Sequence, residues 1–239
     1  MKVSASSHAY SARSLRRTPF RPVRPVSRPP AGALGLALLC VLGLAATWCV
    51  AALVPAAHAR DATALYDFTL LNRGNVEWVA NGVLDLLNTA TATVWALVLV
   101  AVALRRRRPR VALAVALVMG LAPLSAEVLK PLVAHSHAVV DGIYIKAASW
   151  PSGHSTAALT LAFCAVLVAP VRMRPTVLAA GLAFAAAVGL SLLILAWHMP
   201  SDVLGGYLLA SLWMSLTVAA LRASDRRWPV ARGLSHAAR

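Results

Sequence analysis

Long apolar runs with almost no charged side chain constrain the fold of this chain more than any other feature. The run from Ala31 to Val54 has 24 residues without a charge, and about 20 helical residues are enough to cross the hydrocarbon core of a bilayer. Five further runs follow, at residues 79–104, 111–129, 155–171, 176–197 and 203–221. Composition agrees, because 59% of the residues are hydrophobic and only 13% are charged. The sequence therefore predicts an all-α, polytopic membrane protein with six transmembrane helices in a bundle.

The two ends of the chain differ from this apolar middle. Residues 1–30 are rich in Ser, Arg and Pro, a composition that cannot bury a core, so we expect a disordered basic tail. Residues 31–222 form the predicted membrane domain, and residues 223–239 form a second basic tail. Ala57-His58-Ala59 resembles a signal-peptidase site. A signal peptide has a shorter apolar core, about 7 to 15 residues, so a retained first helix is favoured over a cleaved leader.

The positions of the basic residues predict how the chain is oriented. The chain has 23 Lys and Arg against 8 Asp and Glu; this excess could suggest nucleic-acid binding in a soluble protein, but here it lies between apolar runs and no nucleic-acid partner is expected. Nineteen of the basic residues fall in the N-terminal tail, in the loops 105–110 and 172–174 and in the C-terminal segment from Arg222, and four fall on the other side. By the positive-inside rule, we expect a protein of the plasma (inner) membrane with both termini cytoplasmic. The loops at 55–78, 130–153 and 198–202 should face outward.

The stretch from Trp150 to Thr156 has the composition of an anion site at the start of a helix. Proline favours a first turn, glycine lets the backbone approach a ligand, and the free N–H groups of a helix N-terminus attract anions. The predicted topology places Lys130, and also His198 with Asp202, on the same membrane face as this stretch. Ionisable residues at such positions of a membrane bundle are functional candidates. The sequence therefore predicts a phosphate site at the outer face.

These residues resemble the motifs of the type 2 phosphatidic acid phosphatase superfamily, which includes vanadium haloperoxidases and bacterial undecaprenyl-diphosphate phosphatases. The family pattern is Lys-x6-Arg-Pro, then Pro-Ser-Gly-His, then Ser-Arg-x5-His-x3-Asp. This chain has Lys130, an intact Pro151-Ser152-Gly153-His154, and Ser191 followed by His198 and Asp202 at the family spacing. The resemblance covers about residues 127–221. It implies a hydrolase of lipid metabolism, namely a multi-pass membrane phosphatase that acts on a lipid phosphate or diphosphate and contacts membrane lipids.

The resemblance also implies a role for each matching residue. His198 would be the nucleophile that forms a phosphohistidine, Asp202 would hold its imidazole in the useful tautomer, and His154 would protonate the leaving oxygen. The phosphate-binding groups would be Lys130, the Ser152 hydroxyl and the Gly153 N–H. The scheme needs no cofactor and no metal. The chain has no His-Glu-x-x-His that would favour a zinc site.

Neither arginine of the family pattern is present. Where the pattern has Arg-Pro the chain has His137-Ala138, and where it has the second arginine the chain has Leu192. An arginine fork binds phosphate in a bidentate way that neither residue reproduces. In one interpretation, protonated His135 and His137 partly replace the clamp and activity rises toward mildly acidic pH. In the other, both are solvated loop residues, and the protein is a catalytically impaired member that binds lipid headgroups or has a structural role.

Three further expectations concern helix faces. Glu127 and Lys130, three residues apart, are expected to form an ion pair. The polar residues Asn81, Asp85 and Asn88 recur on one helical face, which we expect to point into the bundle. The pair Gly205-Gly206 at the start of the last span is expected to permit close helix packing. Substrate identity, among phosphatidate, phosphatidylglycerol phosphate and polyprenyl diphosphate, and oligomeric state do not follow from the sequence.

Overall fold

The computed structural model describes residues 30–228, so the predicted tails at 1–30 and 223–239 lie largely outside the described residues. Within the described part the chain is helical and has no β-strand, which confirms the all-α prediction. The elements are α1 (Ala31–Leu53), α2 (Pro55–Thr69), α3 (Val76–Asp85), α4 (Thr89–Arg105), α5 (Pro109–Leu132), α6 (Gly153–Val168), the short 3-10 helix η1 (Val171–Met173), α7 (Arg174–Ile194) and α8 (Pro200–Arg227).

Four of these helices are long and apolar enough to cross a membrane: α1, α5, α7 together with η1, and α8. A fifth candidate is the pair α3 and α4, which are bent by 50° relative to each other. Helix α6 has only 16 residues, which span about 24 Å at 1.5 Å per residue. The chain is therefore a multi-pass membrane protein with four to five candidate spans, and the predicted number of six is not confirmed.

The second predicted span is broken where the sequence suggested a continuous helix. Asn88 caps α4, because its side chain accepts a hydrogen bond from the Thr91 amide at 3.0 Å. The Thr91 hydroxyl also donates to the Asp85 carbonyl at 2.8 Å, which fixes the turn. Asp85 and Asn88 are exposed, so the expectation that this polar face points into the bundle is wrong. Asn88 begins a new helix that is bent by 50° from α3, so Asn88 does not continue the helical face of Asn81 and Asp85.

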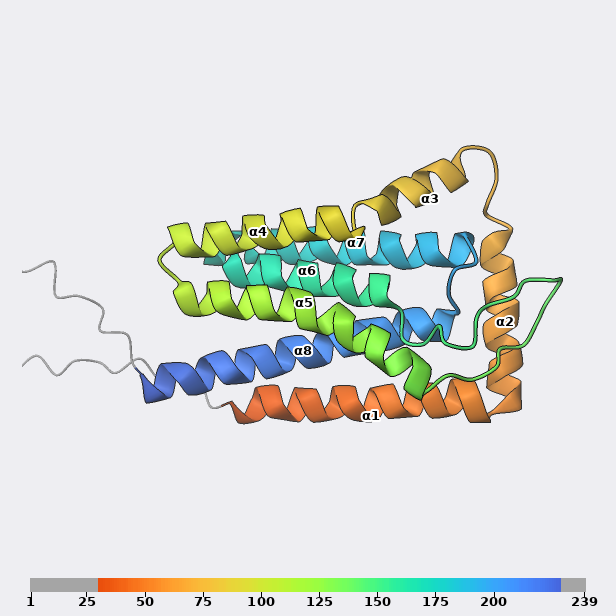
Figure 1. The fold of residues 1–239 in the computed structure, drawn as a ribbon, viewed down its shortest axis with the longest axis horizontal. Coiled ribbons are helices and arrows are strands. Elements are labelled where there is room, and N and C mark those ends of the chain that lie inside the picture. Colours follow the sequence, from red (N-terminus) through yellow and green to blue (C-terminus); the bar gives the residue numbers. More distant parts are fainter. Residues whose placement is uncertain (1–29, 229–239) are drawn as a thin grey trace, which may run out of the picture.

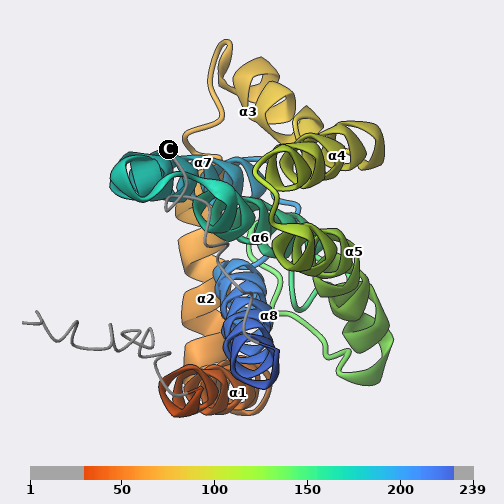
Figure 2. The same ribbon diagram turned by 90° about the vertical axis from the view of Figure 1, so that its left-hand side faces the viewer.

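Helices α1, α4, α5, α6, α7 and α8 run side by side, and α2 lies across one end of the bundle (Figure 1). The α4–α5 turn, the α6–α7 connection, the start of α1 and the end of α8 all lie at the opposite end. Viewed along the bundle, α6 is central (Figure 2), and it packs against α4, α5, α7 and α8. The α5–α6 loop and the α7–α8 junction consequently meet at the end covered by α2.

Glycines in α8 allow the α6 segment to approach closely, as expected for Gly205-Gly206. A Cβ on Gly206 would lie 2.6 Å from the Ser152 carbonyl oxygen, and one on Gly205 would lie 2.5 Å from Trp150 Nε1. Trp150 is consequently buried against α8. The core next to this contact contains Leu159 of α6 and Leu192 of α7. This packing places the first turn of α6 against the first turn of α8.

Candidate active site

The N-terminus of α6 is the first component of the site. Ser152 is its N-cap: its hydroxyl accepts a hydrogen bond from the Ser155 amide at 3.4 Å, and its carbonyl accepts one from the Thr156 amide at 3.1 Å. Among the described residues, the amides of Gly153 and His154 have no hydrogen-bond partner. Free N–H groups at a helix N-terminus attract anions, and anion binding at this one stays a prediction.

The second component, His198, lies at the junction between α7 and α8. Helix α7 ends in a Schellman motif, in which the Trp197 amide donates to the Leu192 carbonyl at 2.9 Å and the Ala196 amide donates to the Leu193 carbonyl at 3.1 Å. Ala196 adopts the left-handed conformation that this motif requires, with φ of 52°. The chain therefore leaves α7 abruptly, and His198 lies between the two helices rather than within either.

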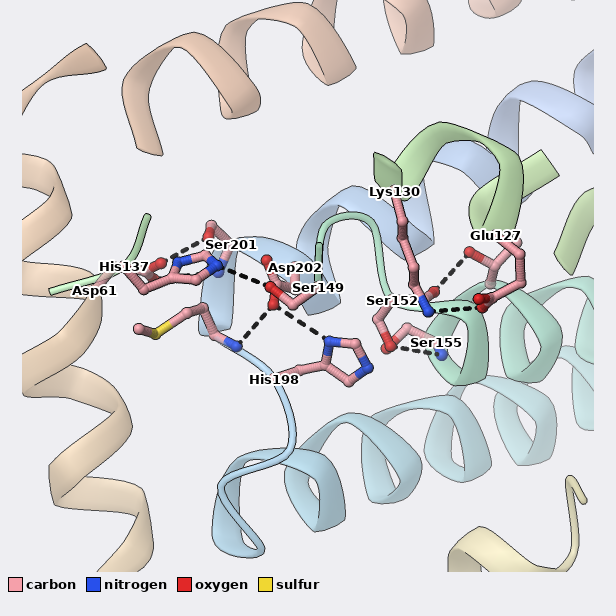
Figure 3. Close-up of polar contacts among 12 residues, drawn as sticks. Asp61, Glu127, Lys130, His137, Ser149, Ser152, Ser155, His198, Ser201 and Asp202 are labelled. Carbon is pink, nitrogen blue, oxygen red and sulfur yellow. Dashed lines mark hydrogen bonds and ion pairs between the residues drawn. The ribbon is translucent and has the colours of Figure 1, made fainter. Parts of the chain in front are cut away.

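Asp202, in the first turn of α8, joins these components. Its Oδ2 accepts a hydrogen bond from the Met199 amide at 3.0 Å and lies 3.2 Å from His198 Nδ1. Its backbone carbonyl accepts one from the Ser152 amide at 3.0 Å. Asp202 is fully buried and His198 is 8% exposed. Because Nδ1 faces the carboxylate, the other edge of the His198 ring is left free, and in Figure 3 it faces Ser152.

Lys130 reaches this region from the last turn of α5. Its Nζ lies 2.6 Å from Glu127 Oε1, so the expected ion pair is confirmed. His154 packs edge to face against Trp197, with ring centroids 6.0 Å apart, and interacts electrostatically with His198, Lys130 and Glu127. Lys130, Ser152, His198 and Asp202 thus lie near one another (Figure 3). Gly153 and His154 follow Ser152 directly, in the first turn of α6.

The two histidines of the α5–α6 loop are placed differently. His137 Nε2 lies 2.8 Å from the Ser149 hydroxyl, and its ring centroid is 4.7 Å from that of His135 and 6.2 Å from that of His58. Burial lowers the pKa of His137; nearby Asp202 opposes this effect, and the neighbouring His135 and His58 add to it. The imidazole is therefore neutral at neutral pH. A neutral imidazole lacks the fixed positive charge that an arginine would have at this position.

At the second arginine position, Leu192 is part of the hydrophobic core. Leu192 is fully buried and packs in a hydrophobic cluster to which α2, α3, α6, α7 and α8 contribute. Leucine has no polar atom in its side chain, so this position offers no donor to a phosphate. The apolar surroundings explain why leucine is stable here.

Two residues of α2 approach the site and were not found from the sequence. Asp61 accepts hydrogen bonds from the Ser201 amide at 3.1 Å and the Ser201 hydroxyl at 2.6 Å, so it caps the start of α8 next to Asp202. Burial raises the pKa of Asp61, although both bonds to Ser201 lower it. His58 lies one turn earlier. The i, i+3 spacing of the buried Ala62 and Leu65 was the available signal that residues 55–69 form a helix rather than a loop.

Comparison with known proteins agrees with this architecture. Residues 111–226 match the family model of the PAP2 superfamily. The crystal structure of a transmembrane PAP2-type phosphatidylglycerolphosphate phosphatase from Bacillus subtilis superimposes with a TM-score of 0.62 at 23% sequence identity, over 84% of this chain and 98% of that chain. A search of curated proteins finds no match. The matched region contains every motif residue described above, and over α5 to α8 this chain belongs to the PAP2 superfamily.

Proposed function

We propose that this protein is a membrane phosphatase that hydrolyses a lipid phosphate or diphosphate through a phosphohistidine on His198. The observation that carries the proposal is that Asp202 contacts both other parts of the site. Its side chain lies 3.2 Å from His198 Nδ1, and its backbone carbonyl accepts a hydrogen bond from the Ser152 amide. A nucleophile, a carboxylate that orients it and an anion-binding helix terminus thereby form one site. Phosphatase-type function in general also agrees with the superfamily.

In the proposed reaction, His198 Nε2 attacks phosphorus while the bond to the leaving oxygen breaks. His154 donates a proton to that oxygen. Asp202 accepts a hydrogen bond from Nδ1–H of His198 and stabilises the positive charge that develops on the ring. A water molecule then attacks the phosphohistidine, His154 takes a proton from this water, and the N–P bond breaks to release inorganic phosphate. No other proton donor or acceptor is needed to balance the two steps.

The phosphoryl oxygens need positive charge and N–H donors in the transition state. We assign this role to Lys130, the Gly153 amide and the Ser152 hydroxyl. A contribution from His135 and His137 stays a prediction. It requires protonation, and burial moves the protonation of His137 to a pH below its ordinary range.

The second candidate function is a catalytically impaired family member that binds a lipid headgroup. The observation that favours it is the loss of both arginine positions, since Leu192 is buried in the core and His137 is bonded to Ser149. Removing one preorganised donor typically costs ~10² to 10³ in rate. The two losses can be tolerated only if the remaining donors are sufficient.

We further propose that α6 crosses the membrane as a short sixth span, and that the site faces outward while the basic end faces the cytoplasm. Supporting this, α6 runs alongside its neighbours for its full length (Figure 1). The candidate substrates are phosphatidate, polyprenyl diphosphate and phosphatidylglycerol phosphate. The third is favoured because the structurally similar protein from Bacillus subtilis is a phosphatidylglycerolphosphate phosphatase.

Phosphate release from these three lipids by detergent-purified protein tests the proposal. We expect the wild type to release phosphate from at least one of them, and His198→Ala and His198→Asn to lose activity by at least ~10³-fold, because the nucleophile is gone. A base-stable, acid-labile phosphoprotein should form with wild type and not with either variant. Unchanged elution and thermal unfolding of the variants would show that they are folded. Equal background release by all three proteins would instead support the headgroup-binding function.

A further inference from the structure

A carboxylate, that of Glu127, lies beside Gly153, the first residue of α6. Glu127 Oε1 lies 2.7 Å from the place that a Cβ on Gly153 would take, and Lys130 Nζ lies 4.0 Å from the same place. The carboxylate therefore rests against the backbone of the first residue of α6. This is the end of the helix at which negative charge is stabilised.

The same carboxylate also forms an ion pair with Lys130. The Nζ–Oε1 distance of 2.6 Å is that of a close ion pair. Because the positions of the two family arginines hold His137 and Leu192, Lys130 is the motif residue that retains a fixed positive charge. While Glu127 is paired with it, the charges of the two side chains cancel, so an incoming phosphate dianion gains little from Lys130.

Glu127 is able to leave this position. Its side chain is 58% exposed, whereas that of Lys130 is only 18% exposed. Rotation about side-chain bonds at the end of α5 would move the carboxylate into the open space and leave Lys130 in place. The arrangement is thus an internal anion that a ligand can displace, at the cost of breaking the ion pair.

We propose that Glu127 is a specificity-determining residue that competes with phosphate for Lys130 and for the N-terminus of α6. It weakens the binding of any phosphate group that lacks further contacts, and it therefore favours the release of free inorganic phosphate over its retention. A lipid substrate overcomes the competition through binding energy from its apolar part. This inference rests on the proposed function, because it assumes that the α6 terminus binds phosphate.

Direct binding of inorganic phosphate tests the inference without relying on turnover. Isothermal titration calorimetry at neutral pH would compare the wild type with Glu127→Gln, which keeps the shape and a hydrogen-bonding oxygen but removes the charge. We expect Glu127→Gln to bind phosphate about tenfold more tightly, since one like charge beside the anion is removed. In the double variant Glu127→Gln with Lys130→Gln, this gain should disappear.

Glu77→Gln is the matched control, because Glu77 is an exposed glutamate of α3 and should leave phosphate affinity unchanged. If Glu127 only positioned Lys130, its substitution would weaken phosphate binding or leave it unchanged, and either result would overturn the inference. If the wild type hydrolyses lipid phosphate while Glu127→Gln binds phosphate no more tightly, only this inference fails. If the wild type neither binds phosphate nor hydrolyses any lipid phosphate, the proposed function and this inference fail together.

Discussion

At the scale of single residues, the two positions that depart from the family pattern have opposite surroundings. His137 keeps a polar environment, with a hydrogen bond to Ser149 and two neighbouring imidazoles. Leu192 is sealed in apolar core. Charge is therefore recoverable at position 137 by protonation but not at position 192. This asymmetry makes His137 the residue at which pH should act.

The folded-state pKa of His137 is below its ordinary value because the ring is buried. In the unfolded chain this histidine titrates near ~6.5. As the pH falls through that value, the unfolded chain takes up a proton that the folded protein resists, so stability is lost until the lower, folded-state pKa is reached. We expect the thermal midpoint of the wild type to fall further between about pH 7 and about pH 5 than that of His137→Gln, which does not titrate. Parallel falls in the two proteins would contradict this assignment.

At the scale of elements, the site depends on how closely α6 and α8 approach. The Ser152 amide reaches the Asp202 carbonyl only because Gly206 has no side chain at the contact. The N-cap of one helix and the first turn of the other are thereby held in register. A change in this spacing alters the core packing and the site together.

Gly206→Ala should separate these two helices. The added Cβ would lie 2.6 Å from the Ser152 carbonyl oxygen and 3.1 Å from the Thr156 amide nitrogen, and backbone on both sides cannot easily move. We expect a loss of about 1 to 3 kcal/mol in the free energy of unfolding, together with loss of phosphate release. Chemical denaturation in detergent measures the first effect.

Gly120→Ala, in α5, is the matched control for this substitution. A Cβ there meets nothing within 4 Å, so stability should be unchanged or raised by up to about 1 kcal/mol through helix propensity. Similar destabilisation by both substitutions would show that the α6–α8 contact is not the cause.

At the scale of the whole molecule, the arrangement of helices separates basic turns from candidate site loops. The α4–α5 turn lies at one end of the bundle, and the α5–α6 loop lies at the other (Figure 1). Basic residues concentrate in the first and not in the second. If the positive-inside rule holds, the two segments face opposite sides of the membrane.

Cysteine labelling in intact cells tests this orientation. The background would carry alanine at Cys40, Cys49 and Cys164, and single cysteines would be introduced at the exposed Asp141 or Arg106. We expect Asp141→Cys to react with a membrane-impermeant maleimide in intact cells, and Arg106→Cys to react only after permeabilisation. The reverse pattern would place the site on the cytoplasmic face.

Much of the site was predictable from local patterns in the sequence. Apolar runs reveal membrane helices because the bilayer interior excludes charge. The contact between His198 and Asp202 was expected from the resemblance to the family motifs. The six motif residues could be assigned to one face because alternating spans return the chain to the same side. Helix breaks were harder to predict, since the cap at Asn88 depends on a single side chain within an apolar run.

Other features were decided only by tertiary structure. The Ser152–Asp202 bond, the cap that Asp61 of α2 places on α8, and the position of Glu127 against Gly153 each join segments far apart in the chain. No periodicity or spacing encodes such contacts, because they depend on how closely whole helices pack. The sequence by itself determined which groups could carry the chemistry. The packing of α2, α5, α6 and α8 decided which of them lie close enough to act together, and which carboxylate lies beside the lysine.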